Sequence, residues 1–65
     1  MKLIVNACPR DIEGKTLGAA LAELGFEAQA TATALNGVFV PREARADTQL
    51  NDGDRLEVLA PMQGG

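Results

Sequence analysis

The chain has 65 residues and a formal net charge of −3 at pH 7, which allows one small acidic domain. It contains one cysteine and no histidine, so an internal disulfide, a zinc site built from cysteine and histidine, and every catalytic triad that uses histidine are excluded. Six Lys and Arg and two Phe are too few for the basic face and stacking aromatics of nucleic-acid binding. We expect a cytoplasmic protein, monomeric when free, with no metal and with neither a nucleic-acid nor a membrane partner.

The apolar content predicts a thin core. Apolar residues make up 46% of the chain, but eleven of them are alanine. For a domain of this size without a disulfide or a structural metal, we expect a free energy of unfolding of about 3–5 kcal/mol.

The first fourteen residues predict a hairpin. Residues 2–6 are apolar and β-branched and should form a strand, with Leu3 and Val5 on one face and Ile4 on the other. Pro9 cannot donate to a β-ladder, so we predict the turn at residues 7–9. Residues 10–13 then form a short edge strand that ends at Gly14.

A helix follows, because apolar residues recur at the helical spacing i, i+3, i+4 and i+7 in Leu17, Ala20, Leu21 and Leu24. Thr16 is suited to the N-cap, and Gly25 to the left-handed position that ends a helix. Gly18 inside the helix lowers the stability of the helix by about 1 kcal/mol relative to alanine. Close approach of the helix to the sheet is the simplest explanation for a glycine at this position.

The second half predicts three more strands, at residues 31–35, 38–40 and 55–60. Asn36-Gly37 is a strong hairpin signal, and residues 51–54 form another turn. Residues 42–50 are polar and irregular, with room for one helical turn. Two alternatives stay open: the buried face of residues 31–35, and whether Phe39 lies in the core or on the surface.

The predicted order is therefore β-β-α-β-β-β. It describes an α+β fold with a mixed sheet of about five strands, one helix across one face, and the last strand parallel to the first. This is the β-grasp, or ubiquitin-like, arrangement. We expect residues 1–60 to form the domain and residues 61–65 to be a flexible tail that ends in Gly-Gly.

Several short motifs add to this order. They are Asn6, Thr16-Leu17, Asn36-Gly37, Val40-Pro41-Arg42, Leu50-Asn51-Asp52-Gly53-Asp54, Glu57 and the terminal Gly64-Gly65. With them the chain resembles, over its whole length, the ThiS family of sulfur carrier proteins of thiamine (thiazole) biosynthesis.

The resemblance implies a carrier without catalytic residues of its own. In this family an E1-like adenylating enzyme uses ATP to join the C-terminal carboxylate, here that of Gly65, to AMP. A sulfur donor fed by a cysteine desulfurase then converts the adenylate to a thiocarboxylate (1-thioglycine), and thiazole synthase takes up the sulfur. The chain itself is expected to bind no cofactor.

The tail suits such chemistry, because its carboxylate must reach into a partner's active site. Gly64 and Gly65 have no Cβ and can pass close to the walls of a narrow passage. Pro61 stiffens the point where the tail leaves the domain. Met62 and Gln63 are then the last side chains able to contact the mouth of the passage.

Docking residues are predicted on the open face of the sheet. Ile4 and Leu59 should share the face turned away from the helix and form an apolar docking patch, although single exposed apolar residues are also ordinary. Arg42 either pairs with an acid of the partner or is a surface arginine of little consequence. The acidic excess of residues 43–57 favours a basic partner face and also aids solubility.

Two other features have structural interpretations. Cys8 is interpreted as incidental, because Arg10 is the one basic residue next to it in sequence. Asp52 and Asp54 flank Gly53 in a turn, where carboxylates usually accept backbone hydrogen bonds.

Three rival functions remain open. The small subunit of molybdopterin synthase shares the fold and the Gly-Gly terminus, but the length and Val40-Pro41-Arg42 favour the thiamine family. A ubiquitin-like protein modifier would use Gly65 to form isopeptide bonds. A plain interaction module would make no use of the terminus.

Overall fold

The structure is a computed structural model and describes residues 1–60. The strands are β1 (Lys2–Val5), β2 (Cys8–Asp11), β3 (Ala32–Leu35), β4 (Val38–Val40) and β5 (Arg55–Leu59), and the helix is α1 (Leu17–Leu24). Two 3₁₀ segments, η1 (Ala28–Ala30) and η2 (Arg42–Asp47), join them. The predicted tail, residues 61–65, lies outside the described residues. In the part of the chain that is described, no helix has the length and apolar character needed to cross a membrane.

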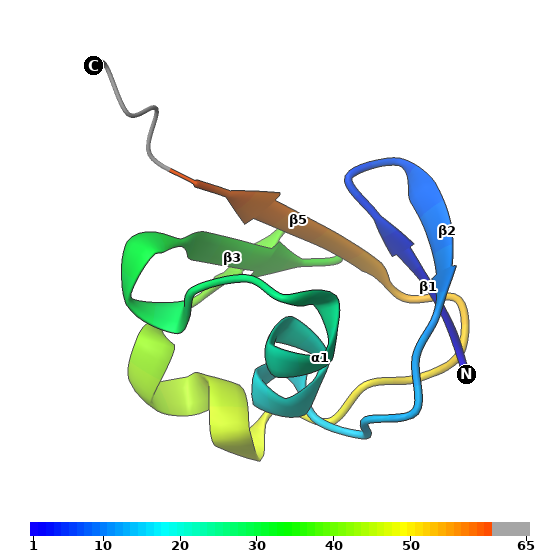
Figure 1. Ribbon diagram of the computed structural model, residues 1–65, viewed down its shortest axis with the longest axis horizontal. Helices are drawn as coiled ribbons and strands as arrows, with labels where there is room; N and C mark the ends of the chain where they lie inside the picture. Colours follow the sequence, from blue (N-terminus) through cyan, green and yellow to red (C-terminus); the bar gives the residue numbers. More distant parts are fainter. Residues whose placement is uncertain (61–65) are drawn as a thin grey trace.

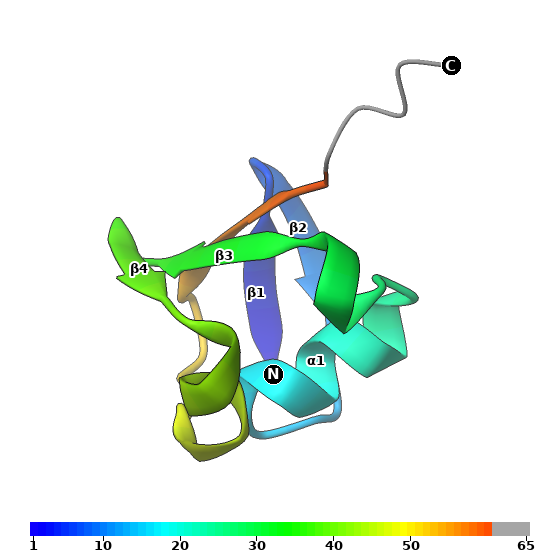
Figure 2. The same cartoon turned by 90° about the vertical axis from the view of Figure 1, so that its left-hand side faces the viewer.

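The strands form one five-stranded sheet in the order β2-β1-β5-β3-β4. β1 and β5 are parallel and the other neighbours are antiparallel, which confirms the predicted mixed sheet and the pairing of the last strand with the first. α1 lies across one side of the sheet, and η2, the yellow-green coil, lies on that side as well (Figures 1 and 2). The fold is the predicted β-grasp arrangement, with two 3₁₀ segments added to its single α-helix.

The core fills the space between α1 and the sheet. Leu3, Val5, Leu56 and Val58 point toward the helix from the two central strands, and Leu17, Ala20 and Leu21 meet them from the helix. The structure also decides the buried face of β3, because Thr33 is buried whereas Ala32 is exposed. For β1 and β5, the alternation of side chains between the two faces of a strand correctly predicted which residues lie in the core.

The first hairpin differs from the prediction. Its turn is Asn6-Ala7, with φ of 49° and 70°, and β2 begins at Cys8 and includes Pro9. Pro9 pairs with Ile4, whose N–H donates to the Asp54 carbonyl on the other side of β1 at 2.9 Å. Since the Ile4 N–H points away from β2, this is a non-hydrogen-bonded pair and the Pro9 nitrogen faces the open edge. A proline at that position removes no ladder hydrogen bond.

The ends of α1 are as predicted. The Thr16 hydroxyl accepts a hydrogen bond from the Ala19 N–H at 3.2 Å, and Gly25 has a φ of 85°. The explanation for Gly18 was wrong, since a Cβ there would face the backbone of Ala46 in η2 at 3.7 Å rather than the sheet. That is an ordinary contact distance, so no steric need for glycine exists at this position.

Candidate functional site

The C-terminal end of β5 is the place where the predicted tail begins. β5 continues past the end of β1, because Val5 lies level with Leu56, three residues before Leu59. The Asn6 side chain extends the ladder beyond this point. Its Oδ1 accepts from the Val58 N–H at 2.9 Å, and its Nδ2 donates to the Val58 carbonyl at 3.2 Å. One amide side chain thus holds the last part of β5 as a further strand residue would.

Asn6 can do this because it occupies the left-handed region in the hairpin turn, which asparagine tolerates better than most residues. Sequence reasoning noted Asn6 as a motif position but missed this contact. The sequence held one indication of this contact: Asn6 directly follows the first strand, which is predicted to lie beside the last strand.

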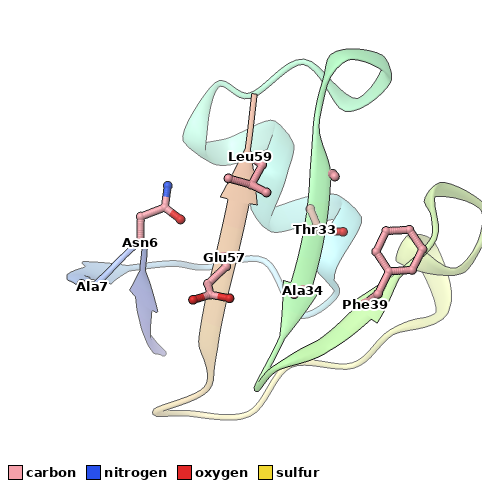
Figure 3. A pocket seen from close by; sticks show the side chains of 8 residues that line it. Asn6, Ala7, Thr33, Ala34, Phe39, Glu57 and Leu59 are labelled. Atoms are coloured by element: carbon pink, nitrogen blue, oxygen red, sulfur yellow. The ribbon is translucent and has the colours of Figure 1, made fainter. Parts of the chain in front are cut away.

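The sheet face turned away from α1, here called the outer face, carries an apolar hollow of about 340 Å³. Leu59 and Glu57 of β5, Ala32 and Ala34 of β3, and Phe39 of β4 are among the residues that line it (Figure 3). Pairing between the strands brings these residues together: Ala34 lies opposite both Phe39 and Glu57, and Ala32 lies opposite Leu59.

Two large apolar side chains of this hollow are open to solvent. Leu59 is 73% exposed and Phe39 is 65% exposed. This decides the open alternative for Phe39, which lies on the surface. Exposed apolar residues that gather in a hollow are typical of protein interaction sites.

The predicted docking residues lie at different parts of this surface. Leu59 lines the first hollow, whereas the half-buried Ile4 lines a second, of about 360 Å³, together with Arg55 and Glu57. Both point away from α1, as expected. Arg42 begins η2 and lies with Phe39 around a third hollow near β4. The docking roles of all three stay predictions.

The tail residues Pro61, Met62, Gln63, Gly64 and Gly65 lie outside the described residues. Their passage into a partner and the modification of Gly65 therefore stay predictions.

Arg45, a residue that sequence reasoning missed, holds the layer beneath the sheet together. Its side chain is 4% exposed and donates to the Thr33 hydroxyl at 3.2 Å, the Ala28 carbonyl at 2.8 Å and the Thr31 carbonyl at 2.7 Å. The guanidinium group thus ties η2 to η1 and to the start of β3. No periodic signal marks it, because it stands in a polar segment where a surface arginine is expected.

The loop before β5 is fixed by its carboxylates. Asp54 accepts from the Asn51 N–H at 2.8 Å and from the Asn36 side chain at 3.1 Å, and Asp52 accepts from the Lys2 N–H at 2.7 Å. These bonds confirm the structural interpretation of Asp52 and Asp54.

Cys8 is exposed with a free thiol. Among residues 1–60, no three His, Cys, Asp or Glu side chains gather as metal ligands would.

Comparison with known proteins agrees with this geometry. The crystal structure of a thiamine biosynthesis protein (ThiS) from Geobacter metallireducens superimposes with a TM-score of 0.82 and 35% identity, covering all of both chains. A solution structure of a thiamine biosynthesis protein from the same organism gives the same TM-score and identity and is covered over 88% of its chain.

Two curated proteins are similar in sequence. The sulfur carrier protein ThiS of Thermus thermophilus is 46% identical over 66 aligned positions, which cover 94% of this chain and 95% of that protein. A thiazole synthase of Paramagnetospirillum magneticum is 38% identical over all of this chain, but the matched segment is only 20% of that enzyme. The model of the ThiS family matches residues 3–65, which include the terminal Gly64-Gly65. On the agreement of sequence and fold, this chain belongs to the ThiS family.

Proposed function

We propose that the chain is the sulfur carrier of thiamine biosynthesis and holds sulfur as a thiocarboxylate on Gly65. The observation that carries the proposal is its 46% identity to a sulfur carrier protein over almost the whole of both chains. The family match extends through Gly65. Such a protein is a cosubstrate of other enzymes and not a catalyst.

The proposed chemistry begins with activation of the terminal carboxylate. An E1-like adenylating enzyme forms the acyl adenylate from ATP and releases pyrophosphate, which turns a poor electrophile into one with AMP as leaving group. The persulfide of a donor loaded by a cysteine desulfurase then attacks the same carbon and expels AMP, which gives an acyl disulfide. A thiol reduces the S–S bond of this acyl disulfide, which leaves the thiocarboxylate on Gly65 and the donor in a disulfide with that thiol. Because these steps consume ATP, the proposal includes a cytoplasmic location for the carrier.

Thiazole synthase is the proposed acceptor of the sulfur. The similarity of this chain to a segment of a thiazole synthase supports the partnership. The fold gives the proposed delivery a fixed starting point, because the Asn6 side chain holds β5 at Val58. Gly65 follows Val58 by seven residues in the sequence.

The experiment is an intact-mass measurement after incubation with ATP, a ThiS-adenylating enzyme, a desulfurase with cysteine, and a thiol reductant. We expect a mass gain equal to the exchange of one oxygen atom for one sulfur atom, and no gain in a chain that lacks Gly65. Absence of the gain, with the enzyme active on a control carrier, would contradict the proposal. The molybdopterin and modifier alternatives would then be tested with their own adenylating enzymes.

A further inference from the structure

Glu57 has an unusual place on the outer face. It is an exposed residue at the middle of β5 and lines both the hollow with Leu59 and the hollow with Ile4. Among the described residues that line these two hollows, Glu57 alone is acidic. Figure 3 shows its side chain on β5, between Asn6 on one side and Ala34 on the other.

The Glu57 carboxylate has no structural task in the domain. Within residues 1–60, no side-chain hydrogen bond or ion pair involves it, whereas Glu23, Asp52 and Asp54 all accept backbone N–H groups. Arg55 is the nearest cation along the strand, and two residues of extended chain separate their Cβ atoms by about 7 Å. The carboxylate is therefore free to accept a group from outside.

We infer that Glu57 receives an arginine or lysine side chain of thiazole synthase, while apolar side chains of that enzyme occupy the hollows on either side. The inference rests on the proposed function and adds the recognition chemistry of the partner. Apolar contact around the carboxylate would exclude water and strengthen the ion pair. The ion pair would also fix the position at which thiazole synthase docks on the outer face, which apolar contact with a flat surface does not do by itself.

Thiazole synthase is the favoured occupant because a segment similar to this chain is part of such an enzyme. The reach of the chain sets a geometric limit. Gly65 is eight residues after Glu57, and eight extended residues span at most about 29 Å. When Gly65 reaches the site where the sulfur is used, the Cα atom of Glu57 must therefore lie within about 29 Å of that site.

The test uses the full chain and purified thiazole synthase from the same organism. Glu57→Gln removes the charge at nearly constant shape, Glu57→Lys reverses it, and Glu27→Gln removes one charge beside η1 as a matched control. Binding is measured by calorimetry at low and high salt, without sulfur chemistry, so the result does not depend on thiocarboxylate formation. Thiocarboxylate formation is followed separately by intact mass.

We expect Glu57→Gln to weaken binding about tenfold and Glu57→Lys more, with a smaller salt dependence than the parent chain. Glu27→Gln should change binding less than twofold, and all three variants should unfold at the parent's midpoint. Equal effects of Glu57→Gln and Glu27→Gln would overturn the inference. So would a loss confined to the adenylating step, because the cation would then belong to the adenylating enzyme.

Discussion

At the tip of the first hairpin, Ala7 has a φ of 70°, in the left-handed region that strains residues with a Cβ. Glycine there relieves about 1–2 kcal/mol of strain and costs about 0.5–1 kcal/mol of extra chain entropy. We therefore expect Ala7→Gly to stabilise the protein by about 0.5–1 kcal/mol, measured as a higher midpoint of urea unfolding.

The matched control for Ala7→Gly is Ala22→Gly, at an exposed position inside α1. There the same change lacks any relief of strain and should destabilise the protein by about 1 kcal/mol. Effects of the same sign at both positions would contradict the argument from backbone geometry.

Glu23 links α1 to the segment before it. Its carboxylate accepts from the Glu13 N–H at 3.0 Å and from the Gly14 N–H at 2.9 Å. These two hydrogen bonds, that of Glu13 first, lower the pKa of Glu23 below its usual value of 4.5. The folded state thus favours the ionised carboxylate, and the unfolded state binds the proton more readily.

This contribution to stability is present above pH 4.5 and is lost as the pH falls through the lower pKa of the folded state. Replacing Glu23 by Gln removes the titrating group. The urea midpoint of the parent chain should therefore fall more steeply below pH 4.5 than that of Glu23→Gln. Parallel pH profiles for the two proteins would show that the two backbone hydrogen bonds do not discriminate between the protonation states.

At the scale of elements, the buried Arg45 joins η2, η1 and β3 through three hydrogen bonds. Lysine keeps the charge but not the planar fork, and we expect Arg45→Lys to cost about 1–2 kcal/mol. Methionine keeps much of the stem, but it leaves the Ala28 and Thr31 carbonyls without their donor, and Arg45→Met should cost about 3 kcal/mol.

Thermal unfolding followed by circular dichroism checks the order, with the parent most stable, then the lysine variant and then the methionine variant. A methionine variant as stable as the parent would show that the two carbonyls find other donors. A stability of about 3–5 kcal/mol leaves little margin, so the methionine variant should be partly unfolded at room temperature.

The same elements show what sequence reasoning can and cannot reach. The helix and the core faces of β1 and β5 were predicted, because their apolar periods of 3.6 and 2 are local properties. The bounds of β2 were not, because whether Pro9 interrupts a ladder depends on which way its nitrogen faces. Arg45 was missed for a similar reason: burial of a charged residue depends on carbonyl groups far along the chain.

The candidate site was predictable only in part. Alternation placed Ile4 and Leu59 on one face, but the hollow around Leu59 also needs Ala32 and Phe39. Their approach depends on the register of β5 with β3 and of β3 with β4, which no single segment encodes. The contact between Asn6 and Val58 likewise depends on how far β5 continues past β1.

At the scale of the whole molecule, the two faces of the sheet separate stability from recognition. Leu56 is completely buried in the core, whereas Leu59, three residues later on the same strand, is 73% exposed. Leu56→Ala should cost about 2–5 kcal/mol, which is as much as the whole stability expected of such a small domain. Leu59→Ala should change the stability by less than about 0.5 kcal/mol.

Binding should respond in the opposite way, because the outer face is where we place the contact with thiazole synthase. Leu59→Ala should weaken binding to that enzyme about tenfold while the unfolding midpoint stays unchanged. Val38→Ala is the matched control: Val38 is 67% exposed but lies opposite Leu35, which packs against the core cluster, so its side chain belongs to the other face. If exposed apolar area alone drove association, both variants would bind more weakly by similar factors. A loss confined to Leu59→Ala would show that the partner contacts the outer face specifically.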